Sequence, residues 1–402
     1  MKLLIVTPHF LPENFKVNDI AFEMKRRGHE VTVMTAIPDY PEGHFPKGYG
    51  VFRRRREVID GVKVHRSLIV PRHSGSAPWL VLNYLSYTLF ATLQALRRGL
   101  ADRYDAVIVH ETSPVLVGIP AVIVKKMQRI PLHFWVLDLW PESLSAAGGI
   151  NNRRLLAPFE ALTRWIYRNC DTLMIGSRGF EKSICCKGDF RSKIEFFPNW
   201  VEDSLETPTE PTAEIPQLPE GFNVVCAGNM GDAQDLPHVM EAALLLKDDG
   251  VNFNFVGDGR KREFVEAYCR EHGLTNVYCH GRYPLASMPS FFRQADVLFF
   301  ALKDTPIFEL TVPSRLQAYM SAGKPVVAMI NGEGAATITE ADCGWSVPAE
   351  SPQRLAELLR RLARTDAAEL ETKGANGKAY ARRHYTLKGC MDHLEQIIDR
   401  QS

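Results

Sequence analysis

The residues with the most suggestive types and spacing lie in the segment KDTPIFELTVPSRLQAYMSAGKP, residues 303–325. A buried strand is expected to end at Lys303, a polar loop then carries Glu309, and a helix opens at Pro313. Lys303 and Arg315 would therefore lie near one helix N-terminus, whose free N–H groups and dipole also attract anions. Two cations and a helix dipole suit a diphosphate, and Glu309 would lie beside it.

Simpler interpretations exist for two residues of this segment. Ser314 and Gln317 have the spacing of a capping box, which would give Gln317 a purely structural role. Arg315 also fits a solvated surface arginine, since most arginines are exposed.

Two glycine-rich turns form a second candidate set. The apolar run FNVVCA leads directly into Gly228-Asn229-Met230-Gly231, and Asp235 is the expected N-cap of the next helix. A turn of the same kind covers 256–260, Val-Gly-Asp-Gly-Arg. Glycine lets a backbone approach a ligand closely, but turns between strands and helices also require glycine for their shape alone.

Several common functional motifs are missing from the sequence. No glycine precedes Gly28, so the first apolar run, 2–6, is not followed by GxGxxG, and no GxxxxGK[ST] occurs. These absences exclude a dinucleotide fingerprint and a P-loop. The twelve histidines form no HxH or HExxH pattern, and we expect no metal site and no other cofactor.

The elements that would position these residues alternate between strand and helix. This alternation predicts βαβ units and parallel sheets covered on both faces, an α/β fold. Strands are expected near 2–6, 31–35, 106–109, 132–137, 172–175, 222–227, 252–256, 276–280, 296–300 and 325–329. Helices are expected near 18–28, 78–98, 115–128, 153–169, 178–186, 236–247, 261–272, 287–294, 314–322 and 352–364, with one or two more from 377 to the end.

A proline-rich segment interrupts the alternation. Residues 198–221 contain five prolines with Thr and Glu and have no periodicity, which predicts a stiff, extended linker. The expected division is a first domain over 1–200, a linker over 201–221, a second domain over 222–376 and a C-terminal helix over 377–402. A ligand would lie in the cleft, at the carboxyl ends of both sheets.

Composition limits the class of protein. The 402 residues are 45% hydrophobic and 24% charged, as in ordinary globular proteins, and 48 Lys and Arg against 47 Asp and Glu argue against a nucleic-acid binder. The eight cysteines show no CxxC pair, and the first residues lack the apolar core of a signal peptide. We therefore expect reduced, buried thiols and a cytoplasmic protein.

One uncharged stretch resembles a membrane span in length only. Residues 77–96 contain no charged side chain, but Asn83, Ser86, Thr88 and Gln94 dilute its apolar character. We expect a buried or interfacial helix. A basic run, Arg53 to Arg56, lies in the same domain. The run and the uncharged helix are equally consistent with a surface that binds anionic lipid and with a solvated loop beside a core helix.

Four parts of the sequence resemble the retaining family 4 glycosyltransferases of GT-B fold, and they occur in order along nearly the whole chain. Within this family the resemblance is to the WbuB-like or colanic-acid-transferase-like bacterial group. The motifs are specific to fold and family but not to a substrate. They are RRGHEVTVMTAIPDYPEG (26–43), VLDLWPESL (136–144), EFFPNW (195–200), and the pair CAGNMGDAQDL (226–236) and FELTVPSRLQAYMSAGKPV (308–326).

The resemblance implies two Rossmann-like domains facing a central cleft, with the acceptor at the first domain and the nucleotide-sugar at the second. Glu309 matches the family's glutamate beside the donor sugar, while Gln317 and Ala318 replace the glutamate that usually holds the ribose. Asn229 and Gln234 stand where many relatives have Arg and Lys.

For the remaining site residues the resemblance is looser. The phosphate clamp would fall to Lys303 and Arg315, with Gly228 and Asn229 also at the donor and Arg282 near the base. Asp138 matches the aspartate of this group at the end of a strand, and capping the following turn is its alternative role. The acceptor-side loop, from His9 to Asn18, lacks the family's glycine pair.

The function implied by the resemblance is transfer of a hexose, N-acetylated or deoxy, from a UDP-sugar to a lipid-linked saccharide in bacterial O-antigen, capsule or exopolysaccharide synthesis. Glu309 and Asp138 are the expected catalytic residues, and the protein would be peripheral on the inner face of the membrane. The alternatives are a sugar-nucleotide epimerase of the same fold and a non-catalytic nucleotide-sugar-binding subunit.

Overall fold

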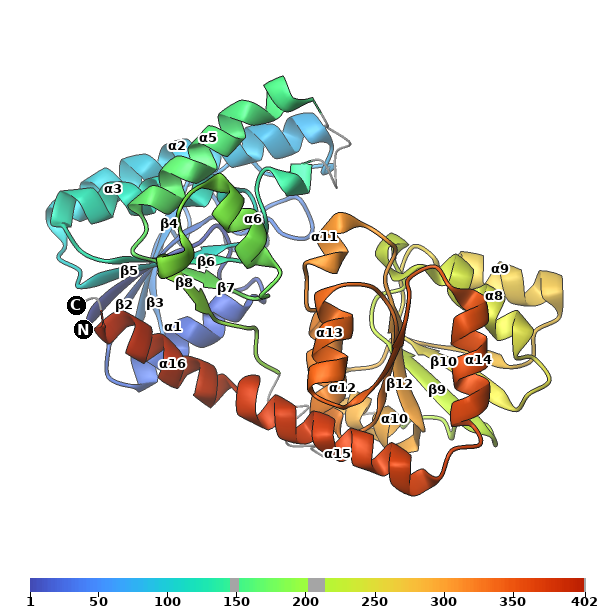
Figure 1. Cartoon of the computed structure of the whole chain (residues 1–402). Helices are drawn as coiled ribbons and strands as arrows, with labels where there is room; N and C mark the ends of the chain where they lie inside the picture. The colour runs from blue at the N-terminus through green and yellow to red at the C-terminus, as the bar shows by residue number, and fades with distance from the viewer. Residues whose placement is uncertain (145–151, 202–213, 401–402) are drawn as a thin grey trace. The chain divides into compact units, whose positions relative to one another are not determined.

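A computed structural model of the chain describes residues 1–144, 152–201 and 214–400, which fall into two compact units (Figure 1). Unit 1 comprises Met1–Phe197 together with the chain from Met391 onward, and unit 2 comprises Pro198–Cys390. Most of the expected linker, 202–213, lies outside the described residues. The chain therefore leaves unit 1 once and returns to it near the C-terminus.

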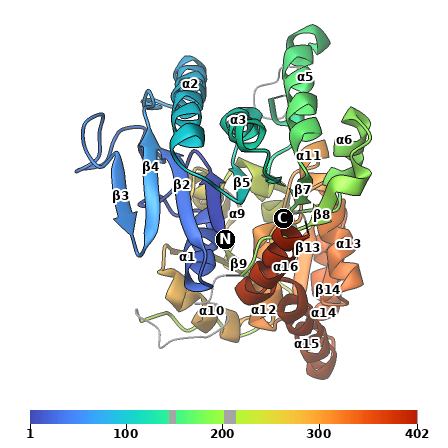
Figure 2. The ribbon, with the colours of Figure 1, turned by 90° about the vertical axis from the view of Figure 1, so that its left-hand side faces the viewer.

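The described residues of unit 1 form a sheet of eight strands in the order β3-β4-β2-β1-β5-β6-β7-β8 (Figure 2). All neighbouring strands are parallel except β3 and β4, which form an antiparallel hairpin. The order reverses between β1 and β5. The bounds are β1 Lys2–Val6, β2 Glu30–Ala36, β3 Arg56–Ile59, β4 Val62–Ser67, β5 Ala106–Glu111, β6 Leu132–Val136, β7 Thr172–Ile175 and β8 Ile194–Phe196.

Helices cover both faces of this sheet (Figure 1). Helices α2, α3 and α5 lie on one face, and α1 and α16 lie on the other. The guanidinium of Arg27, just beyond α1, bonds Glu395 and Asp392 of α16, which ties the returning helix to unit 1. The bounds are α1 Lys16–Arg26, α2 Ala77–Ala101, α3 Gly118–Gln128, α5 Arg153–Asn169, α6 Phe180–Lys187 and α16 Leu387–Asp399.

The hairpin of β3 and β4 was not among the strands expected from the sequence. Its turn is Asp60-Gly61, and both residues have positive φ, 46° and 82°. An Asp-Gly pair between alternating apolar residues is a strong signal for such a two-residue turn. The basic run around Arg56 obscured the alternation of the flanking residues.

Unit 2 contains a second sheet whose described strands are all parallel, in the order β11-β10-β9-β12-β13-β14. This is the strand order of a Rossmann fold, and it reverses between β9 and β12. The bounds are β9 Phe222–Ala227, β10 Val251–Val256, β11 Val277–Gly281, β12 Val297–Ala301, β13 Val326–Met329 and β14 Gly344–Val347.

Alternate residues of β9 enter two different cores. Val224 packs with the helices on one face, and Val225 packs with those on the other. Helices α8 Leu236–Leu245, α9 Arg262–His272 and α14 Pro352–Leu362 contribute to the first core. Helices α10 Met288–Gln294, α12 Ser314–Ala322, α13 Glu333–Glu340 and α15 Ala367–His384 contribute to the second. Both faces are thus covered, as continuous apolar strands require.

The C-terminal region differs in detail from its expected bounds. Helix α15 begins at Ala367, and the chain belongs to unit 1 only from Met391, within α16. No helix in the described parts of the chain is both long and apolar enough to cross a membrane. Of the eight thiols expected to be buried, four are buried, three are partly buried and Cys186 is exposed.

Candidate active site

The reversal of strand order in unit 2 places two loops on either side of one crevice. The loop after β9 begins at Gly228 and the loop after β12 contains Lys303. The backbone N–H of Lys303 donates to the carbonyl of Ala233 at 3.0 Å, so the two loops lie against each other. Such switch points are where open α/β sheets bind ligands.

The glycine turns here are required by close backbone contact. The N–H of Gly228 donates to Val256 at 2.9 Å, and that of Met230 donates to Asp258 at 2.9 Å. Gly257 has φ 152°, and a Cβ there would lie 2.0 Å from the carbonyl oxygen of Gly228. A side chain at Gly257 would therefore force the two turns apart.

These turns border a cavity of 400 Å³. It brings together four predicted donor-site residues, Gly228, Asn229, Arg282 and Arg315, from three separate segments of the chain. The other lining residues are Ala227, Val256, Gly257, Asp258, Tyr283, Leu285, Met288, Phe292, Ala318 and Tyr319. The cavity thus combines apolar and aromatic walls with two guanidinium groups, a character that suits a nucleotide.

The guanidinium of Arg315 is held at the mouth of the first glycine turn. Its Nη2 donates to the carbonyl of Asn229, and a Cβ on Gly228 would lie 3.0 Å from its Nε. Arg282 is mostly exposed, with its Nε 3.4 Å from a carboxylate oxygen of Asp258. Arg315 is therefore not the freely solvated arginine of the simpler interpretation, whereas Arg282 can move.

Lys303 and Glu309 do not line this cavity. Glu309 ends a short helix, α11 Pro306–Glu309, and its side chain is exposed. Gly332, with φ 74°, presses against the backbone of Glu309, since a Cβ there would lie 2.0 Å from its carbonyl oxygen. That contact fixes the path of the loop and holds Glu309 beside α13.

Of the two predicted helix caps, the N-cap at Asp235 is confirmed and the capping box at Ser314 is not. The N-cap of α12 is Pro313, so Ser314 and Gln317 form no capping box. Asp235 is the N-cap of α8, as predicted, but its φ is 47° and its carboxylate accepts from His238 Nδ1 at 2.8 Å and not from a helix N–H. One such cap bond occurs instead at Gln234, whose Oε1 accepts from the N–H of Gly231 at 2.9 Å.

In unit 1, the predicted acceptor-side loop is a buried polar network. His9 Nδ1 lies 2.8 Å from Glu13, and Arg72 donates to His9 Nε2 at 2.8 Å. Because a guanidinium only donates, Nε2 must accept, and the ring proton lies on Nδ1 facing Glu13. Asn18 donates to the carbonyl of Glu13 at 2.8 Å. His9 and Asn18 are both buried and hold the loop in shape.

Two carboxylates follow neighbouring strands at the same edge of this sheet. Asp138 comes two residues after β6, and its carboxylate accepts from the hydroxyl of Ser143. Glu111 ends β5, is fully buried, and forms no side-chain hydrogen bond of standard geometry among the described residues. Burial and the charge of Asp138 raise the pKa of Glu111 well above its ordinary value.

Glu111 was not predicted from the sequence, although it ends an otherwise apolar run, AVIVHE. The preceding residue, His110, is also buried, and burial and nearby His9 lower its pKa to about 3. Its Nδ1 lies 3.2 Å from the hydroxyl of Thr7. The sheet edge therefore holds a neutral imidazole and a carboxyl group that resists ionisation. No group of His, Cys, Asp or Glu in the described ranges is arranged to hold a metal ion.

Two protein-family models match successive parts of the sequence. A "Glycosyl transferase 4-like domain" covers residues 15–200, and "Glycosyl transferases group 1" covers residues 221–365. This chain is a family 4 glycosyltransferase. The two matched regions correspond to the two Rossmann-like sheets, and the glycosyltransferase has the GT-B fold expected from its motifs.

The glycosyltransferase also resembles individual bacterial proteins. It is 27% identical over 338 residues to WbjE of Pseudomonas aeruginosa, which is named as a probable glycosyltransferase. The aligned region covers 76% of this chain and 82% of WbjE. It is 25% identical over 338 residues to WcaI of Escherichia coli, named as a colanic acid biosynthesis glycosyl transferase, with 80% and 82% covered.

Solved structures agree on the fold of this glycosyltransferase. HepE from Anabaena, solved in complex with UDP, matches with a TM-score of 0.70 over 100% of both chains at 15% identity. Sucrose-phosphate synthase from Thermosynechococcus elongatus matches with a TM-score of 0.72 over 99% and 98% of the chains at 14% identity. At these identities the likeness concerns the GT-B fold alone.

Proposed function

We propose that this glycosyltransferase transfers a hexose, N-acetylated or deoxy, from a UDP-sugar to a lipid-linked saccharide, with retention at the anomeric carbon. The observation that carries the donor part is the cavity at the switch point of unit 2, which joins glycine turns, an anchored Arg315 and apolar walls. The acceptor part rests on relatives named for polysaccharide synthesis, among them WcaI.

In this proposal the nucleoside lies against Tyr283 and the apolar wall, and the diphosphate lies against the turn at Gly228. Arg315 is already oriented by its bond to Asn229, so little reorganisation would accompany binding. HepE, a protein of the same fold, was solved in complex with UDP and with UDP-glucose, which supports a uridine nucleotide as the donor.

The reaction breaks the bond between the anomeric carbon and the diphosphate oxygen. Negative charge grows on the leaving diphosphate, which Arg315 and Lys303 would stabilise, while the sugar becomes oxocarbenium-like. Glu309 would orient the sugar hydroxyls from the neighbouring loop. Asp138 would polarise a donor or acceptor hydroxyl, and the neutral Glu111 beside it would not compete for the proton.

Activity and stereochemistry test this proposal together. The purified enzyme would be incubated with a panel of UDP-sugars and an extract of bacterial lipid-linked saccharides, with UDP release and product anomers measured by NMR. Glu309→Gln should reduce transfer at least about tenfold, roughly 1.4 kcal/mol in the barrier. Glu371→Gln, on the exposed surface of α15, is the matched control and should leave the rate unchanged.

The other outcomes separate the competing functions. Conversion of the UDP-sugar without any acceptor would indicate an epimerase. UDP binding without turnover under any condition would indicate a non-catalytic subunit, and an inverted anomer would contradict retention. An unchanged rate in Glu309→Gln would remove that residue from the mechanism.

A further inference from the structure

Helix α2 turns its large apolar side chains away from the sheet. Apart from the aromatic Tyr87, its buried positions are small or polar: Asn83, Ser86, Ala91, Ala95 and Gly99. Its exposed positions form a row of large apolar residues at intervals of three and four: Leu82, Leu85, Leu89, Leu93, Leu96 and Leu100, with Trp79 and Val81 near its start. A helix packed on its own core shows the reverse pattern.

Hydrogen bonds fix this orientation. Asn83 donates to Asp39 at 2.8 Å and to the carbonyl of Val70 at 2.7 Å, and the N–H of Val70 donates to Ser86 at 2.9 Å. Rotating α2 to bury its leucines would leave these buried polar groups without partners, which is unfavourable. The outward leucines are therefore built into the fold.

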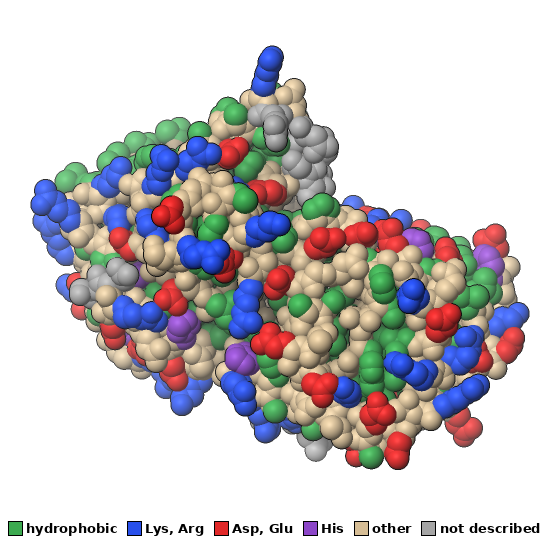
Figure 3. Space-filling view, viewed as in Figure 1, with side chains coloured by type: hydrophobic (Ala, Val, Ile, Leu, Met, Phe, Trp, Pro, Cys, Tyr) green, Lys and Arg blue, Asp and Glu red, His purple; other side chains and the backbone are tan. Residues whose placement is uncertain are grey.

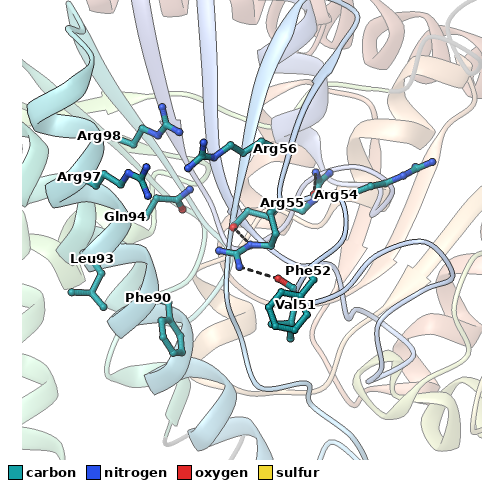
Figure 4. A pocket seen from close by; sticks show the side chains of 11 residues that line it. Val51, Phe52, Arg54, Arg55, Arg56, Phe90, Leu93, Gln94, Arg97 and Arg98 are labelled. Carbon is teal, nitrogen blue, oxygen red and sulfur yellow. Dashed lines mark hydrogen bonds between the residues drawn. The ribbon is translucent and has the colours of Figure 1, made fainter.

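A cavity of 740 Å³ adjoins this leucine row, between α2 and the β3–β4 hairpin (Figure 4). Its polar wall is rich in arginine: Arg54, Arg55, Arg56, Arg66, Arg97 and Arg98, with Gln94. Its apolar wall is Val51, Phe52, Phe90 and Leu93. No Asp or Glu is among these lining residues, which all belong to the described part of the chain. Leu93 belongs to both the row and the cavity, so the two features are continuous.

Much of this positive charge is uncompensated. Arg98 pairs with Asp102 at 3.0 Å and Arg66 pairs with Glu57, but Arg54, Arg56 and Arg97 have no acidic partner within 4 Å among the described residues. The guanidinium groups of Arg56, Arg97 and Arg98 lie along one side of the cavity in Figure 4.

The same charge acts on neighbouring His65. Burial, followed by the charges of Arg98 and Arg56, lowers the pKa of His65 to about 4. Of the predicted basic run, Arg53 is not among the cavity residues, whereas Arg66, Arg97 and Arg98 join it from elsewhere in the chain.

We propose that the leucine row of α2 and the arginine cavity together dock on an anionic lipid bilayer, with lipid phosphate groups in the cavity. An in-plane helix with leucines in the acyl boundary and arginines at the headgroups is a typical interfacial arrangement. Figure 3 shows apolar side chains along the edge of unit 1 that α2 occupies. Phe52, 97% exposed at the cavity rim, would insert with them.

Charge complementarity selects this occupant. The segment from Ala77 to Ala101 contains no acidic residue, so nothing on the helix repels an anionic headgroup. This inference deepens the proposed function. It rests on that function in one respect, because an enzyme with a lipid-linked acceptor must reach the acceptor at a bilayer.

Vesicle flotation tests the proposal with the full-length protein. Vesicles of phosphatidylcholine alone should retain little protein, and vesicles that also contain phosphatidylglycerol should retain most of it. Leu89→Gln should weaken partitioning about tenfold, as expected for losing one buried leucine. Leu245→Gln, at an exposed leucine of unit 2, is the matched control and should not alter partitioning.

Neutralising arginines separates charge from apolar contact. Arg56→Gln with Arg97→Gln should weaken binding about fivefold for each residue, or about 25-fold together. Arg270→Gln with Arg382→Gln removes the same charge from exposed positions in unit 2 and should have little effect. All variants should keep the unfolding temperature of the unaltered protein, because the changed side chains are not in a core.

Several results would overturn the proposal. One is equal binding of the protein to both kinds of vesicle, and another is an equal loss of vesicle binding in the test variants and their controls. A third is a dimer, detected by light scattering, that Leu89→Gln dissociates. Binding of inorganic diphosphate without vesicle binding would show that the cavity takes a free anion instead. Flotation requires no sugar transfer, and UDP binding requires no bilayer, so failure here is distinct from failure of the proposed function.

Discussion

Glu111→Gln replaces a buried carboxyl group with a neutral amide of nearly the same shape. Glu111 is fully buried, and burial and Asp138 raise its pKa well above the ordinary value of 4.5. The backbone N–H groups of Leu137 and Asp138 offset only part of that effect. Above pH 4.5 the folded protein therefore holds a proton at Glu111 that the unfolded chain has released.

The sign and size of the effect follow from this difference. Below pH 4.5 the carboxyl group is protonated in both the folded and the unfolded chain, so folding takes up no proton and the stability that the raised pKa provides is fully present. As the pH rises toward the raised folded-state pKa, the free energy of unfolding falls by up to about 1.4 kcal/mol per pH unit. Glu111→Gln removes this dependence, so it should gain stability relative to the unaltered protein as the pH rises above 4.5.

Thermal unfolding measured by circular dichroism from pH 5 to pH 8 would test this prediction. The stability difference between Glu111→Gln and the unaltered protein should grow steadily with pH, while Glu371→Gln should show no such trend. A difference that is constant with pH, or that shrinks, would mean that Glu111 is ionised in the fold and has a partner that stabilises its charge.

The other predictions concern the two sheet edges. Gly257→Ala should abolish stabilisation by UDP in thermal unfolding, because its Cβ would clash with the carbonyl oxygen of Gly228, 2.0 Å away; retained binding would show that the turns can separate. Tyr319→Phe removes a hydroxyl that bonds both the N–H of Ala227, at 2.8 Å, and its carbonyl, at 3.1 Å. It should lower the free energy of unfolding by about 1–2 kcal/mol in urea titrations. Asp138→Asn should reduce transfer at least about tenfold with UDP affinity nearly intact, whereas collapse of UDP affinity would make its role structural.

Most strands of the parallel sheets could be predicted because they are continuous apolar runs, whereas the short and only partly buried β8 and β14 were not predicted. The run expected near 296–300 is β12, and the run expected near 222–227 is β9. Such strands are buried on both faces, so periodicity is not needed to find them. The hairpin of β3 and β4 is partly exposed and rich in arginine, and its only clear signal was the Asp60-Gly61 turn.

The residues that line the cavity of unit 2 were predicted in part. Gly228 and Arg315 are 87 positions apart, yet both follow strands adjacent to the switch point, so topology brings them together. Lys303 and Glu309 were expected beside them, but neither side chain lines the cavity. Glu309 lies in α11, and its backbone packs on Gly332, a contact between distant residues that local sequence does not encode.

The arginine cavity was beyond sequence reasoning for a similar reason. Arg54 to Arg56 were visible as a basic run, but Arg66, Arg97 and Arg98 lie on β4 and α2. Only the packing of α2 against the sheet places them beside the run. The outward direction of its leucines likewise depends on hydrogen bonds from Asn83.

Nucleotide binding at the cavity of unit 2 is the most direct test of the central claim. Thermal unfolding would be recorded with UDP, GDP, ADP and CMP, for the unaltered protein, Arg315→Gln and the control Arg270→Gln. At 100 times its dissociation constant a ligand adds about 2.7 kcal/mol of stability. We predict stabilisation by UDP alone, lost in Arg315→Gln and kept in Arg270→Gln. Stabilisation by none of the four nucleotides, or equal stabilisation in both variants, would contradict the account.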